Sequence, residues 1–567
     1  MVASIGMILA GLRAEQRVQN ASISTAHNRT IEVVAQLATN GRVVRLGMLF
    51  LDRFPVVNPV VTLLDNHPPH LAHVNYGGEV CVIEDAGLSS DLNDPIGIAR
   101  WWLGRTLAIL DDSYNQALNG NFSSLLNEFS GYWLPIGKHD VQLLVEPFGG
   151  HRIVTGYLQG GALRAVDVAG SKISKTHPSR RGIAQQEKVP VAYLPLSQPV
   201  LPPGRASSVG AAFIRQAIDA QPVREREKML GMLKAMPKAN PDRHYLLSQL
   251  APDGMLNTVG LTVRVKRSHP DPVSGSAKVK KVTPWNVTHN FRNYQVPRGG
   301  ALPNLTNKSV VVVGCGSLGG VLARTLVQSG VGNLHLVDDD RYSADNVYRH
   351  ILPASCIGQF KSEALKSTLL AEYDGVIITS SSKNIEMVED SVFADSPDLV
   401  CLATGSPNAE RDLVRRRLLS STTPPIVSGW IEPLSLGGHV MLSEHGRHGC
   451  LECNFSGQAL ATGAGSLVSF LLSGQNVQRS LMGCAGTFTP YTAVDAMQTA
   501  SIMARTVQER LLLADTPFYR FWRGGDHFAN CAGIKTSQWY KRSSIVDLET
   551  ASGGVKNNDC AICGEWK

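Results

Sequence analysis

The pattern of apolar and polar positions divides the chain into three regions, which we place at residues 1–138, 139–290 and 291–567. The first region opens with an apolar stretch whose spacing predicts a packed helix. Three strand-like runs follow, and a second apolar stretch then predicts another helix. The two helices are expected at residues 2–12 and 96–110, and the strands at 31–38, 43–51 and 59–64. This order of elements indicates an α+β domain.

The middle region has a mixed pattern of apolar and polar positions. Residues 171–205 are polar and contain proline and glycine, which predicts a loop or linker. Residues 206–250 have the spacing of helices. No motif in this region indicates a chemistry, so we expect a mixed middle domain whose role the sequence does not specify.

The last region alternates strands and helices, which predicts a Rossmann-like α/β domain. An apolar strand at 309–313 leads into a turn and then into a helix at 320–329. The turn holds Gly314, Gly316 and Gly319 in the pattern G-x-G-x-x-G. Such glycines let backbone N–H groups approach a pyrophosphate closely, and the helix N-terminus adds partial positive charge.

A carboxylate follows at the place where a ribose is bound in such folds. A second predicted strand, 333–337, ends at Asp338, which lies 19 residues past Gly319. A carboxylate at this distance can accept hydrogen bonds from ribose hydroxyls. These features alone fit an NAD-dependent dehydrogenase as well as an ATP-dependent enzyme.

The residues that come next favour chemistry on a phosphate. Asn346, Arg349 and Lys361 follow the second strand, and Lys361 opens another predicted helix. Taken singly, the two cations read as ordinary surface charges. Taken with their spacing, they favour an enzyme that attacks an α-phosphate, because charge builds up on the phosphoryl oxygens. A dinucleotide oxidoreductase has no evident use for two cations there.

These residues carry a family resemblance. The segments are GVGNLHLVDDD, SADNVYRH, GQFK and, further on, PIVSG. They resemble the adenylation domain shared by ubiquitin-activating enzymes and the bacterial ThiF/MoeB-type activators of sulfur carriers, over roughly half the chain. The resemblance implies that the glycine turn holds ATP and that Asp338 binds the ribose. It also implies that Asn346, Arg349 and Lys361 serve the phosphates, with Arg349 acting in catalysis.

Two positions depart from that family. The family places an aspartate, which helps to hold Mg²⁺, where this chain has Gly405. We therefore expect another Mg²⁺ ligand, with Asp340 as the candidate, or a local slip in the correspondence. The family also has an extra arginine in a helix before the glycine turn, for which Arg292 and Arg298 are the two candidates.

Four of the ten cysteines form two C-x-x-C pairs. The pairs are Cys450 with Cys453 and Cys560 with Cys563. Four thiolates in this arrangement suit a closed tetrahedral zinc site, which would be structural. The alternative is four unrelated thiols. The resembled family has cysteine pairs at corresponding places.

Cys484 is the candidate thioester cysteine of the adenylation domain. It precedes a helix-like run at 491–506, and a helix N-terminus favours the thiolate. The resembled family places its thioester cysteine after the first zinc pair and before this helix. Residues 457–483, rich in glycine and serine, would then form the crossover loop. Cys484 could instead be a small buried residue, and Cys531 is the rival candidate.

A second reactive cysteine is expected at Cys81. Strand-like runs, a proline-bearing turn and a histidine-rich segment precede it, which resembles the ubiquitin-conjugating fold. That family has an asparagine about eight residues before its cysteine, which stabilises the oxyanion when an amine attacks. Here His73 is closest to that place. His70 and His73 also suggest a metal pair, although no third ligand is evident.

The composition limits which ligands and which cellular location we expect. The chain has 567 residues, of which 43% are hydrophobic and 18% charged, with a net charge of +7. The basic runs are short, so we expect no direct binding of nucleic acid. No apolar stretch is long enough for a membrane span, and the cysteine usage fits a reducing cytoplasm.

The combined resemblance implies a relay. ATP would adenylate the C-terminal carboxylate of a protein, Cys484 and then Cys81 would carry the acyl group, and an amine, such as a target lysine, would receive it. The domain order resembles fused enzymes of bacterial CBASS anti-phage operons, which implies a cGAS-like cyclic-oligonucleotide synthase as the activated protein. A homodimer is expected from the family. The alternatives are an NAD enzyme and a ThiF/MoeB-type adenylating enzyme of a sulfur carrier or ubiquitin-like protein with an inert peptide-binding N-terminal domain.

Overall fold

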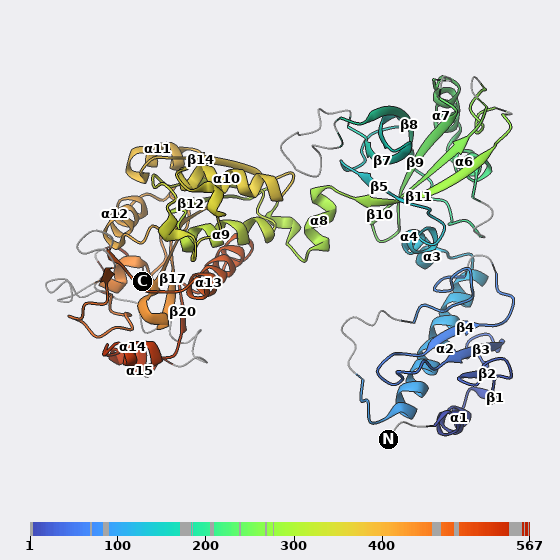
Figure 1. Cartoon of the computed structure of the whole chain (residues 1–567), viewed down its shortest axis with the longest axis horizontal. Helices are drawn as coiled ribbons and strands as arrows, with labels where there is room; N and C mark the ends of the chain where they lie inside the picture. The colour runs from blue at the N-terminus through green and yellow to red at the C-terminus, as the bar shows by residue number, and fades with distance from the viewer. Residues whose placement is uncertain are drawn as a thin grey trace. The chain divides into compact units, whose positions relative to one another are not determined.

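The computed structural model describes the chain with several gaps. The described residues are 4–68, 71–82, 90–169, 183, 185–204, 209–237, 240–266, 269–275, 277–455, 466–480, 487–543, 558, 560, 562–564 and 566. They fall into two compact units (Figure 1). One lies within Met1–Lys172 and Gln185–Asn290, and the other mainly within Phe291–Lys567.

The first unit begins with a four-stranded antiparallel sheet, ordered β1-β2-β3-β4. Its strands are β1 Val18–Ile23, β2 Thr30–Gln36, β3 Val43–Leu49 and β4 Val60–Leu63. Helix α1 (Ile5–Arg13) packs against the long helix α2 (Pro95–Leu118). Alternate residues of β2 are buried, as the period of a strand with one face on a core requires. The predicted strands and the two predicted helices of this region are therefore present.

A short hairpin beyond β4 carries Cys81. Val74 and Val80 pair across it, and the Val80 N–H donates to the Val61 carbonyl of β4 at 2.8 Å. Gly78 makes the close approach to β4 possible, since a Cβ at this residue would lie 2.6 Å from the Leu63 carbonyl oxygen. The hairpin is thus fixed to the sheet, with Cys81 exposed.

The rest of the first unit is a closed barrel, ordered β10-β11-β5-β7-β6-β8-β9. Its strands are β5 Asp140–Leu143, β6 Arg152–Gln159, β7 Ala162–Asp167, β8 Glu187–Leu196, β9 Asp242–Leu250, β10 Leu256–Arg264 and β11 Lys281–His289. Helices α6 (Ala211–Asp219) and α7 (Val223–Lys234) pack on it. Two predictions were wrong in part: the expected linker contains β8, and the expected helical stretch ends in β9. Their apolar runs are too short for periodicity to separate strand from helix.

Two short helices, α3 (Ser123–Asn127) and α4 (Phe129–Trp133), connect the sheet to the barrel. Phe129 and Trp133 belong to the same buried cluster as the barrel strands and α6. The Trp133 indole N–H donates to the carbonyl of Trp285 in β11 at 3.1 Å. Because aromatic side chains bury a large apolar area, this segment is firmly attached to the barrel.

The second unit is built on a seven-stranded sheet, ordered β14-β13-β12-β15-β16-β17-β20. Its strands are β12 Ser309–Val313, β13 Asn333–Val337, β14 Ile377–Ser381, β15 Leu399–Leu402, β16 Ile426–Glu432, β17 Gly437–Ser443 and β20 Tyr519–Arg523. The first five in sheet order are parallel, and β17 and β20 are antiparallel to their neighbours. Reversal of strand order beside β12 makes the Rossmann-like crevice where ligands bind.

Helices cover this sheet. They are α8 Arg292–Arg298, α9 Ser317–Gln328, α10 Lys361–Glu372, α11 Ile385–Ala394, α12 Pro407–Leu418, α13 Ala493–Leu512, α14 His527–Cys531 and α15 Gln538–Arg542. Helix α13 contacts α9 and the strands β16, β17 and β20.

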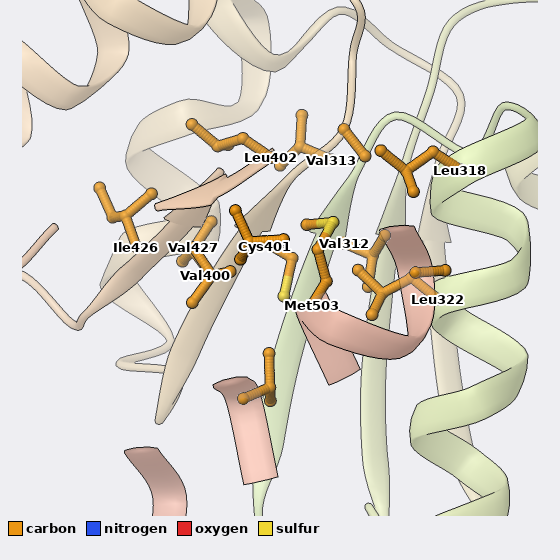
Figure 2. Packing of buried hydrophobic residues seen from close by; sticks show 14 of the residues in the cluster. Val312, Val313, Leu318, Leu322, Val400, Cys401, Leu402, Ile426, Val427 and Met503 are labelled. Atoms are coloured by element: carbon orange, nitrogen blue, oxygen red, sulfur yellow. The ribbon is translucent and has the colours of Figure 1, made fainter. Parts of the chain in front are cut away.

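The core is continuous between strands and helices. Figure 2 shows side chains of β12, β15 and β16 packed together, with Leu318 and Leu322 of α9 and Met503 of α13 beside them. Met503 occupies the space left by Gly429, because a Cβ there would lie 2.2 Å from the Met503 sulfur. The predicted Rossmann-like α/β domain is confirmed. Among the described helices, none has the length and hydrophobicity that a membrane span needs.

Candidate functional site

A cavity of about 810 Å³ opens in the second unit, above the carboxyl ends of the parallel strands. The glycine turn, the start of α10 and the segment after β15 form one part of its lining. The end of β16, the 3₁₀ helix η6 (Leu451–Phe455) and the residues before α13 form the other part. The sequence-predicted residues Gly316, Asn346, Arg349 and Lys361 all lie on this cavity.

Backbone packing holds the glycine turn in place. Gly314 has a φ of +88°, and a Cβ on it would lie 2.4 Å from the Ala403 carbonyl oxygen. A Cβ on Gly319 would lie only 1.7 Å from the carbonyl oxygen of Gly314. Glycine is therefore required at both positions. The N-terminus of α9 faces the cavity as a result, with its unpaired N–H groups available to an anion.

His350 stabilises the same turn, which the sequence reasoning missed. Its Nε2 lies 2.7 Å from the Cys315 carbonyl oxygen, and its Nδ1 accepts from the Leu352 N–H at 3.1 Å. A carbonyl can only accept, so Nε2 carries the proton. Burial lowers the pKa of His350, which favours this neutral form. Sequence reasoning did not single out His350, although it is the last residue of the segment SADNVYRH, because its partner is a backbone carbonyl 35 residues away.

Asp338 lies at the end of β13, beside the glycine turn. Its carboxylate accepts from the Cys315 N–H at 2.6 Å and from the Asp340 N–H at 2.8 Å. Burial raises the pKa of Asp338, while these N–H groups and Lys361 act in the opposite direction. The carboxylate is thus oriented by the backbone before any ligand binds.

The two predicted cations have different partners. The Lys361 ammonium donates to Asp340 at 2.7 Å and is largely buried, whereas Asp340 is exposed. The Arg349 guanidinium lies 5.2 Å from the centre of the Tyr491 ring, and the Tyr491 hydroxyl is 2.7 Å from the Ser317 hydroxyl at the start of α9. Tyr491 therefore links one cation to the helix N-terminus, a role that sequence reasoning missed.

The segment after β15 contains no aspartate. Gly405 lines the cavity with a φ of +72°, in the place of the aspartate that the family resemblance led us to expect. Behind it, the Glu410 carboxylate accepts from the Thr404 N–H at 2.8 Å and the Thr404 hydroxyl at 2.7 Å. Burial raises the pKa of Glu410. Neither Arg292 nor Arg298 lines the cavity; the Arg292 guanidinium donates instead to the carbonyls of Gly330 and Val331.

The four paired cysteines come together. Their ligand atoms all lie within 4.8 Å of one another, and all four residues are buried. The Cys450 and Cys560 sulfurs are 3.8 Å apart, and those of Cys453 and Cys563 are 3.4 Å apart. The Gly449 N–H points to the Cys563 sulfur at 3.4 Å, as is suited to a thiolate. This donor set and spacing fit one tetrahedral metal ion.

The cysteine cluster is connected to the cavity wall through Arg411. Glu452, between Cys450 and Cys453, pairs with the Arg411 guanidinium through two hydrogen bonds of 2.9 and 2.7 Å. The Phe455 ring lies 4.3 Å from the same guanidinium. Arg411, Leu451 and Phe455 all line the cavity. Arg411 is thus a third cation at the cavity, missed because its helix reads as a solvated basic face.

The first unit brings Cys81 and His73 together. The Cys81 N–H donates to the His73 carbonyl at 2.8 Å, so the two residues are neighbours across the hairpin. His73 has a φ of +61°. Its Nδ1 lies 2.5 Å from the Glu128 carboxylate, and its N–H donates to the same carboxylate at 3.1 Å. The hydrogen bond to Glu128 raises the pKa of His73, whereas burial acts to lower it.

Of the two candidate thioester cysteines in the second unit, the structure describes Cys531 but not Cys484. Cys484, His70 and residues 457–465 and 481–483 lie outside the described residues. Cys531 is exposed at the end of α14, with its sulfur 3.8 Å from Nε2 of His527.

Two family models match the chain. The ThiF family matches residues 292–523, and the Prokaryotic E2 family B matches residues 12–140. The chain joins a ThiF-family domain to a prokaryotic E2-like domain. The cavity and the cysteine cluster belong to the part of the chain that contains the ThiF-family domain, and the Cys81 hairpin lies in the E2-like domain.

One relative matches most of the chain, and two others match nearly half of it. The ATP-dependent ubiquitin transferase-like protein Cap2 of Pseudomonas aeruginosa is 24% identical over 80% of this chain and 82% of its own length. Cap2 of Vibrio cholerae is 27% identical over 48% of this chain and 46% of its own length. Cap2 of Escherichia coli is 29% identical over 46% and 42%. The matched region therefore spans less than half the length of the last two relatives.

A solved structure is also similar. The crystal structure of E. coli MccB with ATP is 18% identical and covers 46% of this chain and 68% of that chain, with a TM-score of 0.32.

The pairing of Arg411 with Glu452 gives a first test in the ThiF-family domain. Both side chains are nearly buried, so E452Q leaves a guanidinium poorly compensated. We expect a loss of about 2 kcal/mol or more in the free energy of unfolding, measured by denaturant titration. The control is D412N, which removes the partner of Arg416 in an exposed pair one turn away and should cost under about 0.5 kcal/mol. Equal effects of the two variants would contradict the buried pairing.

Proposed function

We propose that the protein uses ATP to activate the C-terminal carboxylate of a protein substrate and then joins it to an amine. The observation that carries this proposal is the cavity of the ThiF-family domain. Its glycine turn, helix N-terminus and cations suit a triphosphate, and its other part suits a peptide. The E2-like domain of the same chain presents an exposed cysteine, which can accept an acyl group.

We propose one orientation for ATP in this cavity. Asp338, held by two backbone N–H groups, would bind the ribose, and Gly316 with the start of α9 would face the phosphates. Arg349 and Lys361 would hold the phosphoryl oxygens. Mg²⁺ would neutralise phosphate charge, with Asp340 as its ligand in the absence of an aspartate at Gly405. Lys361 would then exchange Asp340 for a phosphate.

The reaction follows from this placement. A carboxylate oxygen attacks the α-phosphorus of ATP, and the bond from that phosphorus to the bridging oxygen of pyrophosphate breaks. The products are an acyl-adenylate and pyrophosphate. Negative charge grows on the α-phosphoryl oxygens during the attack, so Arg349 and Lys361 lower the barrier by lying beside them.

The apolar part of the cavity suits the tail of the substrate protein. Trp430, Ile431, Phe455 and Phe488 line it. An extended C-terminus can lie against these side chains while its carboxylate reaches the cations. Arg411, fixed by Glu452, supplies a positive charge along this path.

The acyl group would next pass to thiols. Cys484 would take it as a thioester, and Cys81 would take it from Cys484 by thiol exchange, before a lysine amine of a target attacks. Cys531, with His527 beside it, is the alternative first carrier. The Cap2 relatives support an ATP-dependent ubiquitin transferase-like activity. From the domain order we propose a cGAS-like cyclic-oligonucleotide synthase as the activated protein, in a CBASS defence system in the cytoplasm, with the enzyme as a homodimer.

The phosphate assignment is tested with K361A. We expect ATP–pyrophosphate exchange, measured with a cGAS-like synthase as the carboxylate substrate, to fall by about 100-fold or more. The control is K366A, an exposed lysine on the same helix that pairs with Glu363 and should leave exchange unchanged. Exchange at the unmutated rate in K361A would refute the assignment.

The cysteine cluster should hold zinc. Elemental analysis is expected to give one zinc per chain, and C563S should lower the thermal stability severely, because metal binding contributes directly to folding. C356S, which changes a half-buried cysteine outside the cluster, should retain the zinc. A stable, metal-free chain would exclude this role.

The order of the thiol relay is visible on gels. C81A should accumulate an adduct on Cys484 that reductant removes, and should form no conjugate, because the acyl group has no second carrier. C484A should load neither cysteine, while acyl-adenylate still forms. C531A should behave like the unmutated chain. Loading of Cys81 in C484A but not in C531A would identify Cys531 as the first carrier.

A further inference from the structure

We propose that Glu128 is a positioning residue that holds His73 as the general base for acyl transfer from Cys81, and that the barrel serves to hold Glu128 there. This inference rests on the proposed function of Cys81 as an acyl carrier. It assigns a role to Glu128 and to the barrel, neither of which a sequence motif indicates.

His73 is the residue that lies opposite Cys81 in the hairpin. The two residues face each other across paired strands, joined by the hydrogen bond from the Cys81 N–H to the His73 carbonyl. His73 occupies the left-handed region, with a φ of +61°, which is uncommon for a residue with a side chain. Such a conformation persists where the surroundings fix it.

Glu128 supplies that fixation with both of its oxygens. One lies 2.5 Å from Nδ1 of His73, and the other accepts from the His73 N–H at 3.1 Å. A carboxylate accepts hydrogen bonds, so Nδ1 carries a proton and, in the neutral ring, Nε2 keeps its lone pair. The same contact therefore fixes the backbone, the orientation of the ring and the tautomer. A base oriented by a carboxylate is a recurring arrangement in acyl transfer.

The barrel determines where Glu128 lies. Glu128 is the residue between α3 and α4, and α4 is anchored in the barrel core by Phe129 and Trp133. On the same segment, the Ser130 hydroxyl donates to Asn257 of β10 at 2.7 Å. The amide of Asn257 in turn donates to the Leu126 carbonyl at 3.0 Å.

Two further contacts attach the Cys81 hairpin to this side of the unit. The Tyr132 hydroxyl of α4 donates to the Leu71 carbonyl at 2.9 Å, and the Tyr76 hydroxyl of the hairpin donates to the Pro203 carbonyl at 2.8 Å. The hairpin segment thus meets the α3–α4 segment at three polar contacts, two from Glu128 to His73 and one from Tyr132 to Leu71, and a further contact joins Tyr76 to Pro203.

The proton transfer can be written out. The amine nitrogen of lysine attacks the thioester carbonyl carbon, and a C–N bond forms. His73 Nε2 takes a proton from that nitrogen as the C–S bond breaks, and the Cys81 sulfur leaves with its electron pair. The imidazolium then returns the proton to the sulfur or to water. No other reactant is needed.

The charged groups around His73 are consistent with this role. Glu128 comes from the junction of α3 and α4, while Asp112 and Arg105 come from α2 and act with opposite signs on the ring. Cys81 lies on the paired strand, and Tyr132 lies on α4. Glu128 raises the pKa of His73, so the neutral ring becomes dominant only at a higher pH than in a chain without this carboxylate.

The experiment starts from Cys81 already acylated, so that it does not depend on the ATP site. Full-length chain with C484A and C531A is charged by exchange with a small glycyl-peptide thioester. Loss of the acyl group to added free lysine is then followed by intact mass. We expect a rate about 100-fold lower in H73A and about 10-fold or more lower in E128Q. The double variant should be no slower than H73A, because both residues act on one step.

Two control variants separate the positioning of His73 by Glu128 from an effect on the folding of the chain. E79Q changes an exposed carboxylate on the same hairpin and should discharge at the unmutated rate. E128D keeps the carboxylate and should recover part of the rate lost in E128Q. If E128Q discharges as fast as the parent chain, or if its effect adds fully to that of H73A, the inference fails. If the parent chain itself discharges no faster than H73A, the proposed role of the Cys81 site in aminolysis fails instead.

The pH dependence distinguishes a base from a hydrogen-bond donor. The ratio of the parent rate to the H73A rate cancels the ionisation of lysine, because H73A lacks the ring. Because a base must be neutral, this ratio should rise with pH through the pKa of His73, and the acid limb of E128Q should lie at lower pH. A ratio that falls with pH would show that the protonated ring acts, and would overturn the assignment.

Discussion

The contact between Gly319 and the carbonyl of Gly314 is the constraint on which the ThiF-family domain depends. Any Cβ at Gly319 would overlap that oxygen, so the turn is as tight as a backbone permits. The tightness directs the N-terminus of α9 into the cavity and leaves Cys315 free to hydrogen-bond Asp338 and His350. This wall of the cavity is therefore set by backbone geometry.

The opposite wall of the cavity has a different origin. It depends on two chain segments about a hundred residues apart, which meet at the four cysteines. Glu452 and Phe455 extend from that cluster and hold the Arg411 guanidinium, which lines the cavity. The cysteine cluster therefore helps to fix this cation in the cavity wall. One wall is thus held by backbone packing. The other wall is held by side-chain contacts and by the cysteine cluster, so it depends more on the state of those side chains.

The sequence predicted what short-range patterns encode. The strand, glycine turn and helix at 309–329 and the cysteine pairs are local motifs. The structure places four of the predicted nucleotide-site residues, Gly316, Asn346, Arg349 and Lys361, on the cavity lining. The barrel was not predicted, because β8 and β9 read as linker and helix. Tyr491, Arg411 and Glu128 were missed because each acts through a contact far away in sequence, with Ser317, Glu452 and His73. The type of a residue does not indicate which distant residue it will contact in the fold.

The attachment of α3 and α4 to the barrel bears on how such a fusion can be inherited. A recombination event that joined a foreign E2-like domain, cut at the end of the matched residues 12–140, would carry Cys81 and Glu128 together but would place α4 on a barrel surface with which it had not evolved. The hairpin, the two short helices and the barrel strand β10 would have to travel as one genetic block. The segment that must be exchanged together is therefore longer than the E2-like region matched by homology. A graft of the matched region alone would place its short helices on a barrel that does not fit them.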